Sequence, residues 1–433
     1  MGAAERARTQ LVDALRASGR VRNPAVEAAF RAVPRHLFLP GLPPHEAYAD
    51  EAVAVQHIDG VATSSASQPS MMAIMLEQLD LRPGHRVLEV GAGTGYNAAL
   101  MTHLVGAGGS VTAVDIDAEL VARAADNLTA AGVSGVDLHC ADGALGHPWR
   151  APYDRIILTV GSADIRPEWV TQLAPGGRLL LPLSVRGSQL STALDLGTDG
   201  ALRSHSVRSC AFIRLRGVGA GVDLSIRLAT AGLVLQPAGG PVDPAAVEAA
   251  LADCGPMVPT AVSLSSADMW DGFGLYLALT QPGACRLLAS TPDAERMPEL
   301  MPIGTWRGTV ALAGSDGLAA VVVIDRNGTA AGSRIGVRAF GSGGPALVDR
   351  LTTALDRWMA AGRPNASGLH ILVIPRSDTP DDEPASETPP STVVIEHYHI
   401  VTGWEHRSHG PPAPARTTPP REAPTCPTDT GNA

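Results

Sequence analysis

The chain has 433 residues, which predicts two or three domains, since one domain usually takes about 100 to 200 residues. Apolar residues make up 45% and charged residues 18%, so a sizeable core is expected and disorder from end to end is excluded. The formal net charge is −10 and all 33 basic residues are arginines, which excludes lysine-based Schiff-base and P-loop chemistry and argues against nucleic-acid binding.

The cysteines and the first residues indicate a soluble, cytoplasmic protein. The five cysteines are widely spaced and form no CxxC pair or Cys/His cluster, so we expect free thiols and no metal site. Residues 1–6 lack the apolar core of a signal peptide, and no apolar run approaches the roughly 18 residues of a membrane span. We therefore expect no membrane association, and the sequence leaves the oligomeric state open.

The first half of the chain alternates between helical and strand patterns. Two short helices are expected before residue 33, then a loop rich in Pro and Gly, then a helix over 69–79. Buried strands are expected at 86–90, 110–114, 136–140, 154–158 and 178–182, with helices at 96–104, 118–131 and 167–173 between them. This alternation predicts an α/β fold with a parallel, doubly wound, Rossmann-like sheet.

Beyond about residue 216 the pattern changes to short β-rich runs around helices at 244–252 and 345–361, which predicts a second, smaller α+β domain. We expect N-terminal helices and loop over 1–50, a core over 51–215, an accessory domain over 216–404 and a disordered tail over 405–433. Within the accessory domain, 376–392 is expected to be a linker, and strands are expected at 369–374 and 393–404.

A glycine-rich turn follows the first buried strand of the core. Missing side chains let the backbone of such a turn approach a ligand closely. A dinucleotide fingerprint requires GxGxxG, whereas these glycines fall at 91, 93 and 95 and the sixth position is Tyr96, so NAD is disfavoured and S-adenosylmethionine is favoured. The alternative is a turn that serves only helix packing.

Acidic and glycine residues follow the next two strands. Asp115 ends the second strand about 20 residues after the glycines, where a carboxylate can accept hydrogen bonds from ribose hydroxyls, and Asp142 with Gly143 ends the third. The carboxyl ends of parallel strands meet at one edge of the sheet. We therefore expect the cofactor to contact Glu89, Gly91, Ala92, Gly93, Thr94, Gly95, Asp115, Asp142 and Gly143.

Further segments carry a family resemblance over roughly residues 5–215. The stretch Val33-Pro-Arg-His-Leu-Phe38, the Ser65-Ala-Ser67 segment before Pro69, the Gly91 turn and Asp142-Gly143 resemble protein-L-isoaspartate O-methyltransferases in order and spacing. The resemblance implies an S-adenosylmethionine-dependent protein carboxyl O-methyltransferase that acts on isoaspartyl carboxylates of peptides or proteins. It also implies that Ser67 lies beside the reacting carboxylate and that Ser65 and Thr159 border the acceptor.

Two segments at the acceptor side depart from the family pattern. The family usually reads Thr-Ile-Ser where this chain has Ser65-Ala66-Ser67, and Thr-Ala-Ala-Pro where it has Thr159-Val160-Gly161-Ser162. The chain also resembles an actinobacterial branch with a C-terminal extension that is associated with ribosomal-peptide maturation. For that branch the resemblance implies methylation of an aspartate in a precursor peptide, which leads to aspartimide and isoaspartate.

Other interpretations stay open from the residues alone. A small-molecule methyltransferase and a cofactor-binding module without turnover are alternative functions. Ser67 could cap the helix near Pro69, and Arg35 could either attract an anionic peptide or form an ordinary surface ion pair. A carboxylate with a pKa near about 4 is ionised at neutral pH, so the reaction needs no general base.

We expect Gly93→Val to abolish cofactor binding, because its side chain would fill the space where backbone and ligand approach each other. Ser67→Ala serves as the matched variant and is expected to keep cofactor binding while turnover falls. Titration calorimetry and a turnover assay measure both effects. Equal cofactor affinity in the wild type and Gly93→Val would contradict the assignment of this turn.

Overall fold

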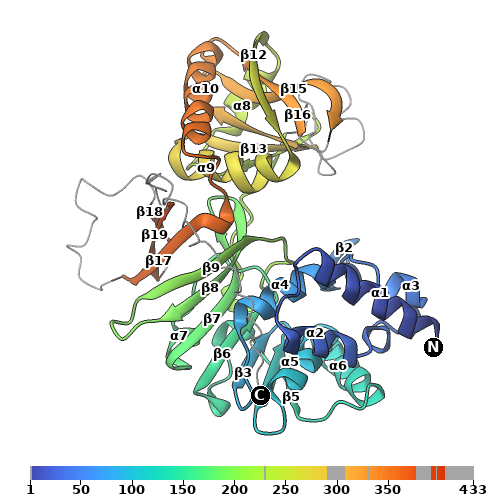
Figure 1. Cartoon of the computed structure of the whole chain (residues 1–433). Helices are drawn as coiled ribbons and strands as arrows, with labels where there is room; N and C mark the ends of the chain where they lie inside the picture. The colour runs from blue at the N-terminus through green and yellow to red at the C-terminus, as the bar shows by residue number, and fades with distance from the viewer. Residues whose placement is uncertain are drawn as a thin grey trace, which may run out of the picture.

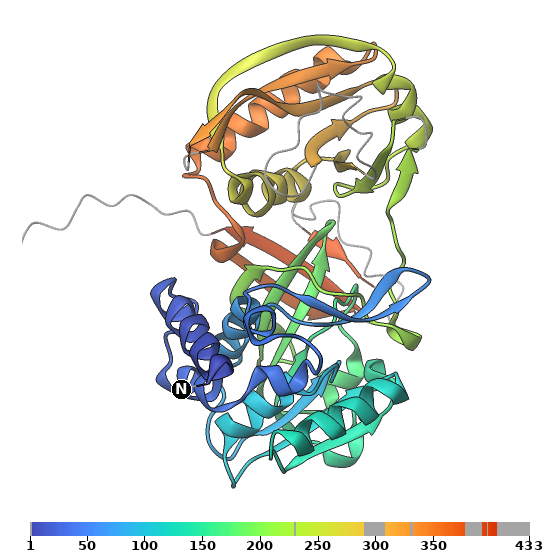
Figure 2. The ribbon, with the colours of Figure 1, turned by 90° about the vertical axis from the view of Figure 1, so that its right-hand side faces the viewer.

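The computed structural model describes residues 2–228, 231–289, 308–329, 332–376, 392–395 and 397–404. Two lobes are visible in Figures 1 and 2, each with its own large sheet. The expected linker and tail, 376–392 and 405–433, lie almost entirely outside the described residues. In the part of the chain that is described, no helix combines the length and apolar character that a membrane crossing requires.

The lower lobe of Figure 1 contains a ten-stranded sheet in the order β18-β19-β17-β9-β8-β7-β6-β3-β4-β5. Five neighbouring strands are parallel and match the expected Rossmann-like core: β5 (Val136–Cys140), β4 (Ser110–Asp115), β3 (Arg86–Val90), β6 (Tyr153–Leu158) and β7 (Leu173–Val185). The remaining strands extend the sheet in antiparallel fashion: β8 (Ser188–Leu196), β9 (Leu202–Ser209), β17 (Leu369–Pro375), β19 (Tyr398–Trp404) and β18 (Thr392–Val394).

Alternation along each strand gives this sheet two apolar faces. Val87 faces a cluster with the N-terminal helices, whereas its neighbour Leu88 faces a second cluster on the other side. The first cluster is covered by α1 (Ala3–Ala17), α2 (Pro24–Ala32), α4 (Pro69–Leu79), α5 (Tyr96–Val105) and α6 (Ala118–Ala130). On the second face lie Trp169 of α7 (Pro167–Thr171) and two leucines, Leu275 and Leu279, from the other lobe.

Local signals fix the ends of several helices. Asn23 caps α2 by accepting a hydrogen bond from the Ala25 amide, and Pro24 occupies the first turn. Asp117 likewise accepts from the amides of Glu119 and Leu120 at the start of α6. The N-terminal part also contains η1 (Arg35–Phe38), α3 (Pro44–Ala47) and an antiparallel hairpin, β1 (Val53–Ile58) and β2 (Val61–Ala66), which the sequence analysis did not predict.

The upper lobe holds the second, smaller α+β unit that was expected. Its antiparallel seven-stranded sheet has the order β10-β11-β13-β14-β15-β16-β12. The strands are β10 (Ile226–Leu228), β11 (Leu233–Pro237), β12 (Cys254–Leu264), β13 (Ala284–Ala289), β14 (Gly308–Ala313), β15 (Leu318–Thr329) and β16 (Gly332–Phe340). Its helices are α8 (Pro244–Leu251), α9 (Gly274–Thr280), preceded by the π-helical turn η5 (Asp268–Phe273), and α10 (Gly344–Ala360).

The sheet topology differs from the expected accessory domain over 216–404. Strands β17 and β19 pair with each other, and β17 pairs with β9, so β17, β19 and β18 complete the sheet of the lower lobe. The second unit is therefore inserted between β9 and β17 and is joined to the first fold by two connections. The sequence pattern could not show this, because an apolar strand run does not specify which sheet it joins.

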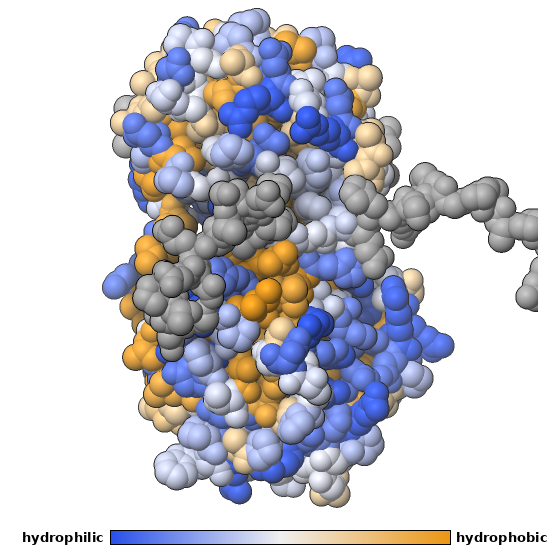
Figure 3. Space-filling model, turned by 90° about the vertical axis from the view of Figure 1, so that its left-hand side faces the viewer, coloured by the Kyte–Doolittle hydropathy of each residue, from blue (hydrophilic) through white to orange (hydrophobic). Residues whose placement is uncertain are grey.

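A group of hydrophobic residues is visible on the lower lobe, below its junction with the upper lobe (Figure 3). Ile374 of β17 is one of the exposed hydrophobic residues, with 40% of its surface accessible. Ile371, three positions earlier on the same strand, is only 2% exposed and belongs to the second apolar cluster.

We expect Ile371→Ala to lower the free energy of unfolding by roughly 2 to 5 kcal/mol, because it leaves a cavity in the core of the first fold. Ile374→Ala on the same strand is the matched control and is expected to change it by less than about 1 kcal/mol. Chemical denaturation followed by the fluorescence of buried Trp169 measures both variants. Similar stability of the two variants would contradict the placement of β17 in this core.

Candidate active site

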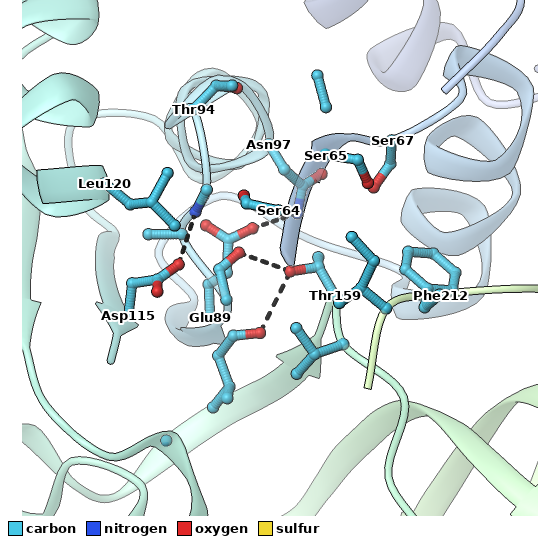
Figure 4. A pocket seen from close by; sticks show the side chains of 18 of the residues that line it. Ser64, Ser65, Ser67, Glu89, Thr94, Asn97, Asp115, Leu120, Thr159 and Phe212 are labelled. Carbon is cyan, nitrogen blue, oxygen red and sulfur yellow. Dashed lines mark hydrogen bonds between the residues drawn. The ribbon is translucent and has the colours of Figure 1, made fainter. Parts of the chain in front are cut away.

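A cavity lies where the carboxyl ends of β3, β4 and β6 face β2 and the segment after β9. Its lining joins three groups of residues that are far apart in the sequence: 63–67, the glycine turn with Glu89 and Asp115, and 212–216. In Figure 4, Glu89, Thr94 and Asp115 lie on one side of the cavity and Ser65, Ser67 and Phe212 lie on the other, with Thr159 between them.

The glycine turn is held by neighbouring strand ends. The amide of Gly93 donates a 3.0 Å hydrogen bond to Asp115, and the amides of Gly91 and Ala92 donate to the carbonyl of Val114. Gly91 and Gly93 have positive φ angles of 99° and 53°, and a Cβ atom at Gly91 would lie 2.7 Å from the Thr159 hydroxyl. A glycine is therefore required at Gly91 both for conformation and for space.

Glu89 is fully buried at the base of the cavity. Its Oε1 atom accepts a 2.8 Å hydrogen bond from the Asn97 side chain, while Oε2 has no partner among the described residues. Burial raises the pKa of Glu89 to about 8, which the hydrogen bond from Asn97 offsets only in part. Oε2 is thus an acceptor that a cationic or hydrogen-bond-donating group of a ligand can satisfy.

Not all predicted cofactor residues line the cavity. Glu89, Gly91, Ala92, Gly93, Thr94, Asp115 and Gly143 do so. Gly95 instead is the N-cap of α5 with φ of 83°, and its Cβ would lie 3.3 Å from Ala124 of α6, so helix packing favours a glycine there and its contact with the cofactor stays a prediction. The Asp142 carboxylate accepts from the amides of Ala144 and Val218, and its predicted contact with the cofactor stays a prediction.

Ser65, Ser67 and Thr159 line the end of the cavity that we call the acceptor side, and their contact with an acceptor stays a prediction. The Ser67 side chain does not cap α4, since Gln68 is the N-cap residue and the Ser70 amide of the first turn donates to Asp50, so that alternative is wrong. Thr159 donates its hydroxyl to the Gly91 carbonyl at 2.6 Å and lies within 3.2 Å of the Val90 carbonyl. It links the acceptor side to the glycine turn.

Arg35 also lines the cavity and is completely buried, so a surface ion pair is excluded. Its guanidinium donates to the carbonyls of Ala47 and Ser67 and lies 5.1 Å from the ring centre of Tyr96. Burial lowers the pKa of Arg35, and the cation next to the Ser67 backbone makes this end of the cavity favourable for an anion.

Sequence reasoning missed several lining residues. Asn97 lies on α5, and Phe212, Arg214 and Arg216 lie in an extended segment after β9. Arg216 approaches Asp115 to 3.9 Å. The position of Asn97 eight residues after Glu89 could have been noticed, because a strand end and the first turn of the next helix adjoin; the segment 212–216 carries no comparable signal.

Comparison with known proteins shows to which family the chain with this cavity belongs. The profile of the protein-L-isoaspartate(D-aspartate) O-methyltransferase family matches residues 6–219. A protein-L-isoaspartate O-methyltransferase of Methanopyrus kandleri is 39% identical over 213 residues, which are 49% of this chain and 92% of the relative. The chain belongs to the protein-L-isoaspartate O-methyltransferase family.

The chain is also similar to a second relative and to a solved structure. A relative from Anaeromyxobacter sp. named protein-L-isoaspartate O-methyltransferase 1 is 38% identical and covers 46% of this chain and 90% of its own length. A solved structure of a protein-L-isoaspartate O-methyltransferase is 23% identical, covers 84% of this chain and 96% of its own, and has a TM-score of 0.47. The family profile ends at residue 219, so the inserted unit lies outside it.

The raised pKa of Glu89 predicts how stability depends on pH without ligand. Between the ordinary glutamate pKa and about 8, the folded state binds a proton that the unfolded state lacks, so stability falls as pH rises. Relative to Glu89→Gln, we expect the wild type to lose roughly 2 to 3 kcal/mol of unfolding free energy between about pH 5.5 and 7.5.

Urea denaturation of the wild type and Glu89→Gln at several pH values measures this difference, and the subtraction removes the contributions of other titrating groups. Above about pH 8 the difference is expected to become constant, since Glu89 is then ionised in both states. Parallel stability curves across the whole range would contradict the protonated state of Glu89.

Proposed function

We propose that the chain is an S-adenosylmethionine-dependent carboxyl O-methyltransferase that methylates isoaspartyl residues of peptides or proteins. One observation carries the proposal: a single cavity joins a glycine turn with buried acidic partners to a serine-lined end beside a buried arginine. The family membership supports the same activity. Methyl transfer requires both ends of the cavity, because the methyl donor and the carboxylate must be held near contact.

The residues of the cavity fit this cofactor. Gly93 leaves space for it, since no atom lies closer than 3.9 Å to a Cβ at that position, and Asp115 ends β4 where hydroxyl groups of a ribose can be bound. The unpaired Oε2 of buried Glu89 suits a positively charged group. When bound, S-adenosylmethionine supplies an electrophilic methyl group.

The acceptor side orients an anion rather than activating it. An isoaspartyl carboxylate is ionised at neutral pH, so no base is required. Ser67 would donate a hydrogen bond to the carboxylate, and Arg35 holds the Ser67 backbone through its carbonyl while adding positive charge nearby. Only interactions that strengthen in the transition state raise the rate, so a weak orienting bond from Ser67 is sufficient.

A second candidate is methylation of an aspartate side chain in a dedicated precursor peptide. Two observations favour it: the chain carries an inserted unit outside the family profile, and it has Gly161 in a loop beside the acceptor, where the family pattern usually has a larger residue. Both reactions transfer a methyl group to a carboxylate and use the same residues. They differ only in the peptide that reaches Ser67.

Mass spectrometry with S-adenosylmethionine and matched peptides tests these functions. One peptide carries isoaspartate and the other aspartate at the same position. We expect a gain of about 14 Da on the isoaspartyl peptide, followed by loss of methanol to aspartimide, and a turnover at least about tenfold lower for Ser67→Ala. His57→Ala, at an exposed position of the hairpin outside the cavity lining, is the control with wild-type turnover.

The outcomes separate the candidates. Methylation of the isoaspartyl peptide alone supports the proposed activity, and methylation of the aspartyl peptide instead supports the second candidate. If neither peptide reacts while S-adenosylhomocysteine binds, a general isoaspartyl methyltransferase is ruled out and a dedicated peptide substrate has to be sought.

A further inference from the structure

One wall of the acceptor side is a short extended segment, Phe212–Arg216, held by backbone hydrogen bonds. The Gly161 amide donates to the Ile213 carbonyl at 2.8 Å, and the Leu215 amide donates to the Gly161 carbonyl at 2.8 Å. Gly161 belongs to the loop after β6 that begins with Thr159. The wall at Phe212 and this loop therefore form one backbone-paired unit.

The side chain of Gln189, on β8, fixes the start of this wall. Its amide nitrogen donates to the Phe212 carbonyl at 3.2 Å, and its amide oxygen accepts from the Phe212 backbone N–H. Both the nitrogen and the oxygen of the Gln189 amide therefore hydrogen-bond to the backbone of Phe212. Gln189 does not line the cavity itself, so any effect it has on the acceptor passes through Phe212.

Gly161 makes room for this amide. A Cβ atom at position 161 would lie 2.0 Å from Nε2 of Gln189 and 3.0 Å from its Cδ, closer than packed atoms can come. Since φ at Gly161 is not positive, the requirement for glycine is one of space alone. Gly161 lies in the Thr159–Ser162 loop, where the sequence departs from the family pattern.

The inserted unit contacts the strand that carries Gln189. Arg286 of β13 donates to the Gly187 carbonyl at 2.6 Å and to the hydroxyl of Ser188, the residue directly before Gln189. On the neighbouring strand, Ser209 hydrogen-bonds to Asp271 of η5 and pairs with Leu190. Two polar contacts from the second unit therefore flank the residue that fixes the wall.

We propose that Gln189 is a positioning residue that sets the acceptor-side wall at Phe212, and that the inserted unit holds Gln189 in place through Arg286. The inference rests on the proposed function for the identity of the acceptor. It gives the second unit a definite role, which is to fix the shape of the site that meets the peptide, while the cofactor side is built entirely from the first fold.

Kinetics of Gln189→Leu and Gly161→Ala test the first part. Both variants are expected to raise KM for the acceptor peptide by roughly five- to twentyfold, as for loss of one or two hydrogen bonds. The Kd of S-adenosylhomocysteine is expected to stay within about twofold of the wild type, since the cofactor side is untouched. Gly108→Ala is the control for adding a methyl group, because Gly108 lies in the loop after the C-terminal end of α5 and a Cβ there would have no atom closer than 3.9 Å.

A compensating variant distinguishes positioning from general loss of structure. If the added methyl of Gly161→Ala acts by displacing the Gln189 amide, it is expected to have no further effect once Gln189→Ala has removed that amide. An acceptor KM in the double variant equal to that of Gln189→Ala supports the pairing. Fully additive effects overturn it.

Hydrogen–deuterium exchange provides a readout that needs no turnover. The Phe212 amide, which donates to Gln189, is expected to exchange several-fold faster in Gln189→Leu and Gly161→Ala and unchanged in Gly108→Ala. Arg286→Lys, which cannot keep both contacts in their present geometry, is expected to accelerate the same amide. Unchanged exchange in the first two variants overturns the role of Gln189, and unchanged exchange in Arg286→Lys overturns the role of the inserted unit.

The positioning role of Gln189 and the proposed function can be contradicted independently of each other. If the wild type methylates neither peptide but the Phe212 amide responds as described, the proposed acceptor is wrong and the assignment of Gln189 to the wall stands. If the wild type is active and the acceptor KM does not change in Gln189→Leu, the acceptor is supported and the positioning role is wrong.

Discussion

The backbone of the glycine turn after β3 is held from both sides, and the rest of the cavity depends on that arrangement. Asp115 accepts the Gly93 amide, and the Thr159 hydroxyl donates to the Gly91 carbonyl. These two contacts come from the ends of the strands on either side of β3. The turn thus keeps a conformation that side chains would block, and the same two residues connect it to Arg216 on one side and to the acceptor loop on the other.

A different buried ionisable residue lies at each end of the cavity, Glu89 at one and Arg35 at the other. Burial raises the pKa of Glu89 to about 8 and its Oε2 has no partner among the described residues, so a nearby cation would favour the ionised carboxylate. Arg35 has its donors occupied by backbone carbonyls and an aromatic ring beside it, so its charge is fixed in place. A ligand with a positive group at one end, next to an acceptor with a negative group, complements this polarity.

Sequence periodicity predicted the parallel core well, because its central strands β3, β4 and β6 are largely buried and read as continuous apolar runs. It also placed Glu89 and Asp115 at one edge of the sheet, since carboxyl ends of parallel strands must meet, whereas Ser67 came only from the family resemblance. It predicted strands at 369–374 and 393–404 but not the sheet they join, because β9, which pairs with β17, lies more than 150 residues earlier. Sequence periodicity also could not identify Gln189, because a side-chain amide that hydrogen-bonds to the backbone of a residue far along the chain produces no sequence pattern.

The insertion of the second unit between β9 and β17 also bears on the order in which the chain can fold during synthesis. N-terminal regions emerge and fold first, at about 5 to 20 residues per second. The parallel core is complete in the chain by residue 185, yet β9 has no partner on its outer edge until β17, which ends at Pro375, has been made. For that interval β9 presents an open edge, which is the kind of template that recruits other strands. The time between the synthesis of β9 and that of β17 therefore sets how long neighbouring nascent chains can pair with this edge.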